Sequence, residues 1–268
     1  MLFFPILYNG AILGTFMNVF YGILFFITIA FAQESLQVVR LNSGFITNEL
    51  EKEIIENVVD LYNRKNSDKF ILDFQTVHSV PHLFSSMDRA NKEENICFLS
   101  AITITNERQQ KYDFSVPYLD IEECLFRLDK HVLKEGWQNR FLKVAYVIGT
   151  TEEALVDSLQ KVYKIVSVPT SDFKEKVALL QAGKVDLMVG DNILGWYSDT
   201  FKIVQSLSTH KKTQYGIAYP KGSPLKNNFD KYIRYFTQSE KFLTLLKHMY
   251  SKDVADYFRK QPYYVSNQ

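Results

Sequence analysis

The chain has 268 residues, of which 46% are hydrophobic and 23% are charged, and its formal net charge is +1. This length allows one large domain or two small lobes, and the composition is not that of a disordered or repetitive chain. The near-zero charge, without a run of Lys or Arg or a stripe of basic and aromatic residues, gives no support for nucleic acid as a partner.

The first 33 residues carry no charged side chain. Within them the segment 19–31 is dense in Phe, Ile and Leu, and Ala30-Phe31-Ala32 has the small-x-small pattern of a signal-peptide cleavage site. The sequence therefore predicts a signal peptide over residues 1–32 and export to the periplasm. This segment is long for a signal peptide and lacks a positively charged N-terminus. Met17 is therefore a candidate for the true start of the protein, and residues 1–16 would then be an over-extension of the sequence. An uncleaved membrane anchor is the alternative, because the apolar part is long enough to cross a bilayer.

Cysteine and histidine give no sign of a cross-link or a metal site. Cys97 and Cys124 allow one disulfide at most, and each lies in an apolar segment, so that free, buried thiols are expected. No cysteine follows the N-terminal apolar stretch closely enough to carry a lipid, which favours a soluble periplasmic protein. His78 and His82 have the spacing of a helical metal pair, but Pro81 lies between them and a third ligand is not near.

Strand-like and helix-like segments alternate along the chain. A strand at 36–39 is followed by a helix from about Asn48, which has capping-box spacing with Glu51, and by a second strand at 70–74. This order predicts a parallel α/β sheet with crossover helices. Further strands are expected at 96–99, 123–128, 144–148, 165–168 and 184–191, further helices at 81–87, 225–236 and 239–250, and a surface segment at 254–268.

The segment 102–118 organises the chain around a candidate anion site. Thr105 can cap a short helical turn in which Arg108 is the third residue. A guanidinium beside free backbone N–H groups and the Thr103 hydroxyl suits a carboxylate, because Arg offers a planar fork of donors and a helix start adds partial positive charge. The alternative is a surface arginine that pairs with a neighbouring carboxylate.

A second candidate site follows the strand at 144–148. Gly149 lets the backbone approach a ligand closely, and Thr150 with Glu153 has capping-box spacing at a helix start. Thr151 can then present its hydroxyl beside that helix start. An ordinary strand-to-helix turn is the alternative.

Asp191 ends the apolar strand at 184–191. In open α/β sheets ligands bind outside the carboxyl ends of the strands, so Asp191 is placed for function. A helix cap for the segment 192–197 is the alternative, and one carboxylate can fill both roles.

Two motifs carry a resemblance to a known family. Thr105-Asn106-Glu107-Arg108, followed by Phe114-Ser115-Val116-Pro117-Tyr118, resembles the signature of the amino-acid-binding proteins of ABC importers, solute-binding protein family 3. Gly149-Thr150-Thr151 and the segment 214–223 are similar to later parts of the same family, so the resemblance covers about residues 35–250.

The resemblance implies the type II periplasmic-binding fold, an α/β fold of two lobes. Each lobe would be a mostly parallel sheet flanked by helices, with the ligand cleft between the lobes. Residues 33–127 would form the first part of lobe 1, residues 128–213 lobe 2, and residues 214–268 the return strand and the C-terminal helices. The strand at 123–128 would then carry the chain out of lobe 1.

The resemblance also implies the roles of the site residues. Arg108 and Thr103 of one lobe and Thr151 of the other would hold the carboxylate of an amino acid, while Asp191 and the backbone carbonyl of Ala101 would hold its ammonium. The loop after the first strand spans only residues 42–47 and lacks the family's Pro-Pro-Phe-like motif, which leaves the ligand's side chain open.

The sequence therefore predicts a monomeric binding protein for a polar amino acid or a similar small zwitterion. It would deliver this ligand to an inner-membrane ABC permease, with no cofactor, no metal and no catalytic residue. A secreted dehydratase-like enzyme on the same scaffold is one alternative, although no Ser/His/Asp set, metal cluster or phosphate loop is evident. The other is an orphan sensor that signals through a partner protein, which the short first loop keeps open.

Overall fold

The computed structural model describes residues 33–42, 47–207, 213–250 and 252–259. The signal peptide predicted for residues 1–32 lies outside these residues. Within the described ranges, none of the helices combines the length and the hydrophobicity that a membrane crossing needs.

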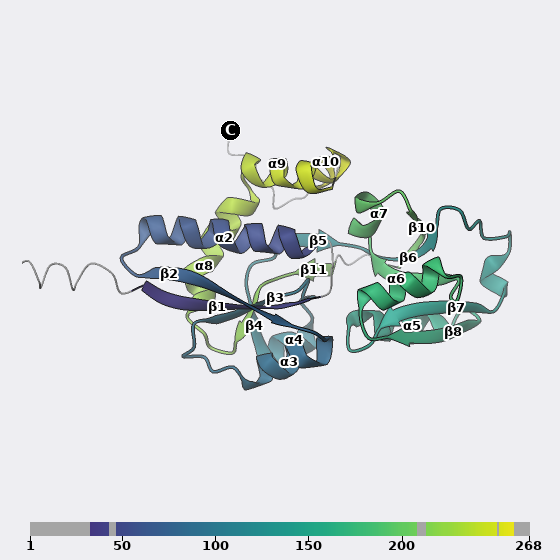
Figure 1. The fold of residues 1–268 in the computed structure, drawn as a ribbon, viewed down its shortest axis with the longest axis horizontal. Coiled ribbons are helices and arrows are strands. Elements are labelled where there is room, and N and C mark those ends of the chain that lie inside the picture. Colours follow the sequence, from purple (N-terminus) through teal and green to yellow (C-terminus); the bar gives the residue numbers. More distant parts are fainter. Residues whose placement is uncertain (1–32, 43–46, 208–212, 251, 260–268) are drawn as a thin grey trace, which may run out of the picture.

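The first of two lobes is built on a five-stranded sheet (Figure 1) with the order β2-β1-β3-β12-β4. Strand β1 runs parallel to β2 and β3, whereas β12 is antiparallel to β3 and β4. The strands of this sheet are β1 (Gln33–Leu41), β2 (Lys69–Val77), β3 (Ile96–Leu99), β4 (Tyr112–Phe114) and β12 (Ala218–Pro220), and the helices of this lobe are α2 (Thr47–Lys65), α3 (Val80–Arg89), α4 (Asn106–Lys111), α8 (Leu225–Thr237), α9 (Glu240–Met249) and α10 (Lys252–Arg259).

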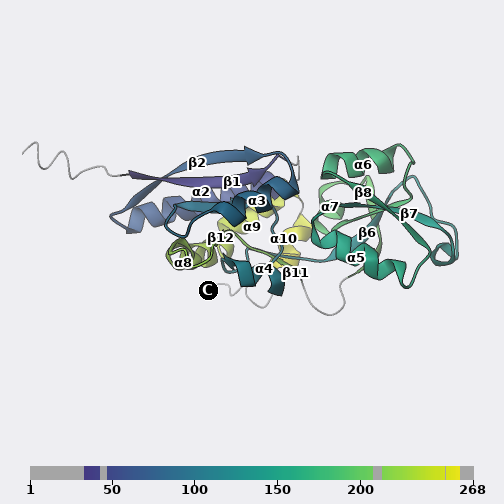
Figure 2. The same cartoon turned by 90° about the horizontal axis from the view of Figure 1, so that it is seen from below.

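The second lobe holds another five-stranded sheet, with the order β10-β6-β9-β7-β8. Figure 2 shows α5 and α6 on opposite faces of this sheet. Successive side chains of β6 point to opposite faces of the sheet, so each face has an apolar surface for one helix. Phe126 packs in the cluster on the α6 side and Leu125 in the cluster on the α5 side. The elements are β6 (Glu123–Leu128), β7 (Leu142–Val147), β8 (Ile165–Thr170), β9 (Leu187–Asp191), β10 (Phe201–Ser206), the 3-10 turn Trp137–Asn139, α5 (Thr151–Gln160), α6 (Phe173–Gln181) and α7 (Ile193–Tyr197).

Two short strands connect the lobes. Strand β5 (Leu119–Ile121) leads from β4 to β6, and β11 (Thr213–Tyr215) leads back toward β12. They pair with each other in an antiparallel two-stranded sheet. The cavity described below adjoins this connection, because Tyr215 of β11 lines it.

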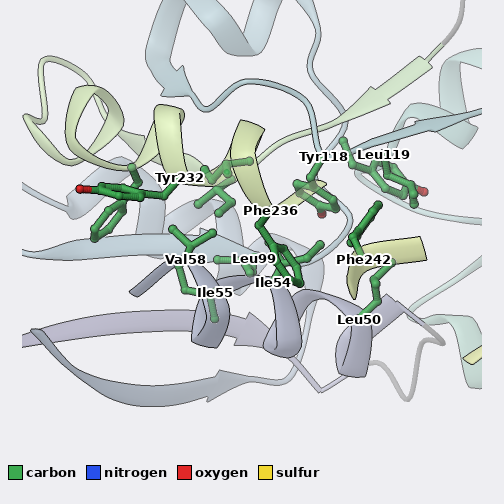
Figure 3. Packing of buried hydrophobic residues seen from close by; sticks show 14 of the residues in the cluster. Leu50, Ile54, Ile55, Val58, Leu99, Tyr118, Leu119, Tyr232, Phe236 and Phe242 are labelled. Carbon is green, nitrogen blue, oxygen red and sulfur yellow. The ribbon is translucent and has the colours of Figure 1, made fainter. Parts of the chain in front are cut away.

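Helix α2 forms because its apolar residues recur at helical spacing on one face. Leu50, Ile54 and Val58 are fully buried, as this spacing predicts. Figure 3 shows this face packed toward Phe236 of α8 and Phe242 of α9. The packing fixes the N-terminal end of α2, and with it Thr47 and Asn48, at the side of the lobe that faces the cavity.

The predicted α/β fold of two lobes is confirmed, and the strands expected at 96–99 and 123–128 have these bounds. The expectation that the strand at 123–128 carries the chain out of lobe 1 is wrong. Strand β6 pairs with β9 and β10 of the second sheet, so the chain leaves the first lobe before Glu123. The other lobe boundaries remain a proposal.

Two further expectations differ from the structure. The return segment 214–223 does not form one strand: β11 pairs with β5, whereas β12 joins the first sheet, and Gly216 between them donates its N–H to the Ile102 carbonyl oxygen. The segment 254–259 is not part of a polar surface tail, because α10 buries Val254, Ala255 and Phe258 in the core of the first lobe. Their positions lie on one face of a helix. Residues 260–268 of the expected surface segment lie outside the described residues.

Ser239 caps α9 and gives a test of the C-terminal packing. Its hydroxyl accepts a hydrogen bond from the Phe242 N–H at 3.2 Å and lies 2.6 Å from the Phe236 carbonyl oxygen. Ser239→Ala is expected to lower the free energy of unfolding by about 1 kcal/mol, as measured by urea denaturation. Ser86→Ala, which removes an exposed hydroxyl bonded to the preceding turn of α3, should change it by less than about 0.5 kcal/mol. Equal losses in both variants would contradict the capping role.

Candidate functional site

A cavity of about 120 Å³ lies between the lobes. The five residues that the sequence predicts for ligand binding all line it, namely Ala101, Thr103, Arg108, Thr151 and Asp191. It continues into a wider groove of about 990 Å³, which shares Thr103, Arg108 and Thr151 with it. The folded chain thus brings the predicted residues together, and their function remains a proposal.

Arg108 is fixed by contacts within its own segment. The Thr105 hydroxyl caps α4 and accepts a hydrogen bond from the Arg108 N–H at 3.2 Å, as predicted. The guanidinium donates from Nη1 to the Thr103 carbonyl oxygen at 3.0 Å, and its Cζ lies 4.7 Å from the centroid of the Phe84 ring. Burial lowers the pKa of Arg108, yet an arginine stays charged in a protein. The guanidinium is therefore held at the cavity, and it has N–H groups beyond the one that donates to Thr103.

Thr151 is the first residue of α5 and faces the first lobe across the groove. Its hydroxyl donates a hydrogen bond to the Glu123 carboxylate. Burial raises the pKa of Glu123, and the hydrogen bond from Thr151 opposes this rise without cancelling it. The capping box expected from Thr150 and Glu153 is only partly formed. Thr150 accepts from the Glu152 N–H at 3.3 Å, and Glu153 accepts from the Gly149 N–H at 3.0 Å.

Asp191 ends β9 at the cavity and is held by the connecting strand. The Tyr215 hydroxyl donates a hydrogen bond to its carboxylate. Burial raises the pKa of Asp191 to about 7, an effect that the Tyr215 hydrogen bond reduces. The alternative role as a helix cap is wrong, because the N-cap of α7 is Asn192.

Ala101 has an unusual backbone and a buried carboxylate behind it. Its φ is 49°, in the left-handed region that residues with a Cβ rarely adopt, and its N–H donates to Glu51 Oε1 at 2.6 Å. Glu51 also accepts a hydrogen bond from the Tyr118 hydroxyl, and burial raises its pKa to about 7. Glu51 is therefore not half of a capping box with Asn48. It lies on the buried side of α2 and supports the turn at Ala101.

A buried ion pair in the second lobe completes the lining. Lys176 of α6 is 1% exposed, and its ammonium lies 2.5 Å from Glu152 Oε1 and 2.7 Å from the Val189 carbonyl oxygen. Glu152 also accepts from the Val147 N–H at 2.8 Å. The pair thereby ties α5 and α6 to β7 and β9.

Sequence reasoning missed Glu51, Glu152, Lys176 and Tyr215. One signal for Lys176 was available, since it lies four residues before the buried Leu180 on the same face of α6. Glu51 and Glu152 lie inside helix patterns, where a charged residue gives no distinct signal. Tyr215 contacts Asp191, a partner that is remote in the sequence.

Possible metal ligands are dispersed in the described part of the chain, and the two thiols lie outside the cavity lining. Among the residues that the structure describes, no group of three or more His, Cys, Asp or Glu side chains is placed to hold a metal ion. Cys97 and Cys124 are free and buried, as expected, and burial raises the pKa of both thiols. Neither residue lines the cavity.

No protein-family model matches the chain, and no curated protein matches it significantly in sequence. Solved structures do resemble it. The GluR0 ligand-binding core from Nostoc punctiforme, in complex with L-glutamate, is 19% identical with a TM-score of 0.63, covering 80% of this chain and 98% of that one. An amino acid ABC transporter substrate-binding protein from Streptococcus pneumoniae, bound to L-arginine, is 18% identical with a TM-score of 0.62, covering 80% and 93%.

A third similar structure is an ancestral amino acid-binding protein, AncCDT-1, described as a precursor of cyclohexadienyl dehydratase. It is 19% identical with a TM-score of 0.61, covering 81% of this chain and 95% of that one. At such identities the comparison establishes the fold. The chain has the two-lobed type II periplasmic-binding fold that its motifs predict.

Proposed function

From this fold and these groups, we propose that the protein is an extracytoplasmic binding protein for a polar amino acid or a similar small zwitterion. It delivers the ligand to an ABC-type importer. The observation that carries the proposal is the meeting of Arg108 and Asp191, a cation from one lobe and a carboxylate from the other, in one small cavity.

A free amino acid carries a carboxylate and an ammonium on adjacent atoms, and the cavity offers a partner for each. Arg108 has donors beyond the one that it gives to the Thr103 carbonyl oxygen, so its fork can take the ligand carboxylate together with the Thr151 hydroxyl. Asp191, with the Ala101 carbonyl, takes the ammonium. Each such charge-assisted hydrogen bond is worth roughly 1.5–3 kcal/mol.

The size of the cavity fits this class of ligand. About 120 Å³ is well below the roughly 300–1,000 Å³ that drug-sized ligands occupy, so the cavity suits a molecule of few heavy atoms. The lobes also meet beside it. Val147 of the second lobe packs in a core cluster of the first, and a Cβ at Gly149 would lie 3.5 Å from Val80 Cγ1.

Because the partners come from two lobes, a ligand makes all of its contacts only when the lobes are together. The closed form is then favoured by the difference in affinity between the two forms, and an importer would recognise that closed form. Similar structures with L-glutamate or L-arginine bound, one of them named as an ABC transporter substrate-binding protein, support this proposal.

One observation favours a second candidate, a dehydratase-like enzyme. Asp191 lines the cavity and has a pKa raised to about 7, which suits proton transfer near neutral pH. One similar structure is described as a precursor of a dehydratase. In the binding protein the same carboxylate is ionised and holds the ammonium, so the two functions need different protonation states of one residue.

A thermal-shift screen of the purified protein against the common L-amino acids and small dicarboxylates tests the proposal. A ligand at 100 times its dissociation constant adds about 2.7 kcal/mol of stability, which raises the melting temperature by several degrees. We expect such a rise with one chemical group of polar amino acids. No rise with any amino acid would contradict the proposal, and turnover of a cyclic acid by the protein would favour the enzyme.

A further inference from the structure

We propose that Thr47 and the Lys176–Glu152 pair form the subsite for the ligand's side chain, and that this subsite selects an uncharged side chain ending in a carboxamide. The inference rests on the proposed function, since it concerns the part of an amino acid that Arg108 and Asp191 do not hold. All three residues line the cavity, Thr47 from the first lobe and the pair from the second.

Lys176 has bonding capacity left for a ligand. Its ammonium carries three N–H groups. Among the described residues, the Glu152 carboxylate and the Val189 carbonyl oxygen take two of them, and the Phe173 ring lies 5.6 Å away. The side chain is 1% exposed, so bulk water does not hydrate the third N–H. A ligand oxygen in the cavity can accept it.

Thr47 is a second buried group that lacks a partner. Its hydroxyl is fully buried, lines the cavity, and has no hydrogen-bond partner among the residues that the structure describes. Buried polar groups are nearly always paired in native proteins, so an unpaired hydroxyl in a cavity points to a bound molecule. Its position at the start of α2 is fixed by the packing of Leu50 and Ile54 behind it.

Glu152 supplies the complementary acceptor. Its two oxygens accept from Lys176 and from the Val147 N–H, and each carboxylate oxygen can accept more than one hydrogen bond. Donor and acceptor thus lie 2.5 Å apart in one pair. A carboxamide matches such a pair, because its oxygen accepts from Lys176 and Thr47 while its NH₂ donates to Glu152.

The charges of the cavity argue against an ionised side chain. Asp172 caps α6 at a partly exposed position, where water screens it. The remaining lining holds two cations, Arg108 and Lys176, and two carboxylates, Glu152 and Asp191. The zwitterionic part of an amino acid leaves this balance unchanged. A side-chain carboxylate or ammonium would add an uncompensated charge beside the Lys176–Glu152 pair.

Calorimetric titration of the purified protein with L-glutamine, L-asparagine, L-glutamate and L-norleucine tests the inference. We expect one of the two amides to bind at least about tenfold more tightly than L-glutamate and than L-norleucine, an apolar analogue of the same length as glutamine. Thr47→Val keeps the shape of the side chain and removes the hydroxyl. It should lower that preference over L-norleucine about tenfold and leave the melting temperature of the free protein unchanged or higher.

The ion pair is tested as a unit, because removing one partner leaves a buried charge behind. Lys176→Met with Glu152→Gln should also weaken the preference for the amide, and where this protein does not fold, Thr47→Val decides. Thr237→Val is the matched control, since that buried hydroxyl donates to the Ile233 carbonyl oxygen at 2.9 Å and does not line the cavity. It should not change affinity.

The outcomes separate this inference from the proposed function. Binding of L-norleucine or L-glutamate as tight as that of the amides, with loss of binding in Arg108→Ala, would overturn the subsite and leave the proposed function standing. An unchanged preference in Thr47→Val would overturn it as well. Absence of binding by any amino acid would overturn both.

Discussion

Arg108→Ala is expected to weaken amino acid binding by at least ~30-fold. The guanidinium is the proposed partner of the ligand carboxylate, and truncating one member of a buried, hydrogen-bonded charge pair costs about 2–5 kcal/mol. Calorimetric titration with the best ligand of the thermal-shift screen measures the loss. The Phe84 ring and the Thr103 carbonyl oxygen hold the guanidinium before a ligand arrives, so little ordering of this side chain is needed on binding.

Two controls separate geometry from charge. Arg108→Lys keeps a cation but loses the planar fork, so a loss of about tenfold is expected. Lys111→Ala removes a positive charge from the same helix. Lys111 lines the wider groove but not the cavity, so its effect should stay below about threefold. Equal losses for Arg108→Ala and Lys111→Ala would indicate a general electrostatic effect and contradict a direct contact.

Arg108 was predictable because its position is set locally. Thr105 caps the helix that carries it, and Thr103 lies five residues away, so a short stretch of sequence contains the whole arrangement. Thr151 and Asp191 were predictable for a similar reason. Each lies where an apolar strand ends, and in an α/β sheet such positions meet at one edge.

The rest of the site depends on contacts between remote parts of the chain. The Glu51 carboxylate reaches the Ala101 N–H across 50 residues, and the local spacing of Asn48 and Glu51 suggested a cap instead. Lys176 and Glu152 come from two different helices that only the second sheet brings together. Local patterns cannot place such pairs.

The expectation that residues 123–128 carry the chain out of the first lobe failed for a related reason. The sequence of an apolar strand such as β6 does not show to which lobe the strand belongs, because its pairing with β9 and β10 involves partners more than sixty residues away. The same limit applies to α10, whose buried face shows only once Val254, Ala255 and Phe258 are known to be helical.

Asp191→Asn is expected to weaken binding about 10–100-fold at pH 8 and to remove most of its pH dependence. In the free protein burial raises the pKa of Asp191 to about 7, whereas the ligand ammonium requires the ionised form. Binding below pH 7 must therefore release a proton, so the affinity should fall as the pH drops, by up to about tenfold per unit. Asparagine carries no proton to release, and its affinity should change little from pH 5 to 8.

The groups around Asp191 are Glu152 and Glu123, which raise its pKa, and Tyr215 and Lys176, which lower it. Glu51 has a pKa raised to the same value, so Glu51→Gln is the needed control and should keep the wild-type pH profile of binding.

The stability of the folded protein is expected to depend on pH in the opposite direction to binding. A carboxyl whose pKa rises on folding stabilises the protein at low pH, and this contribution is lost as the pH rises through about 7. Asp191→Asn should therefore unfold with less pH dependence between pH 4 and 7, and a variant that keeps the wild-type profiles of both binding and unfolding would show that Asp191 does not titrate in this range.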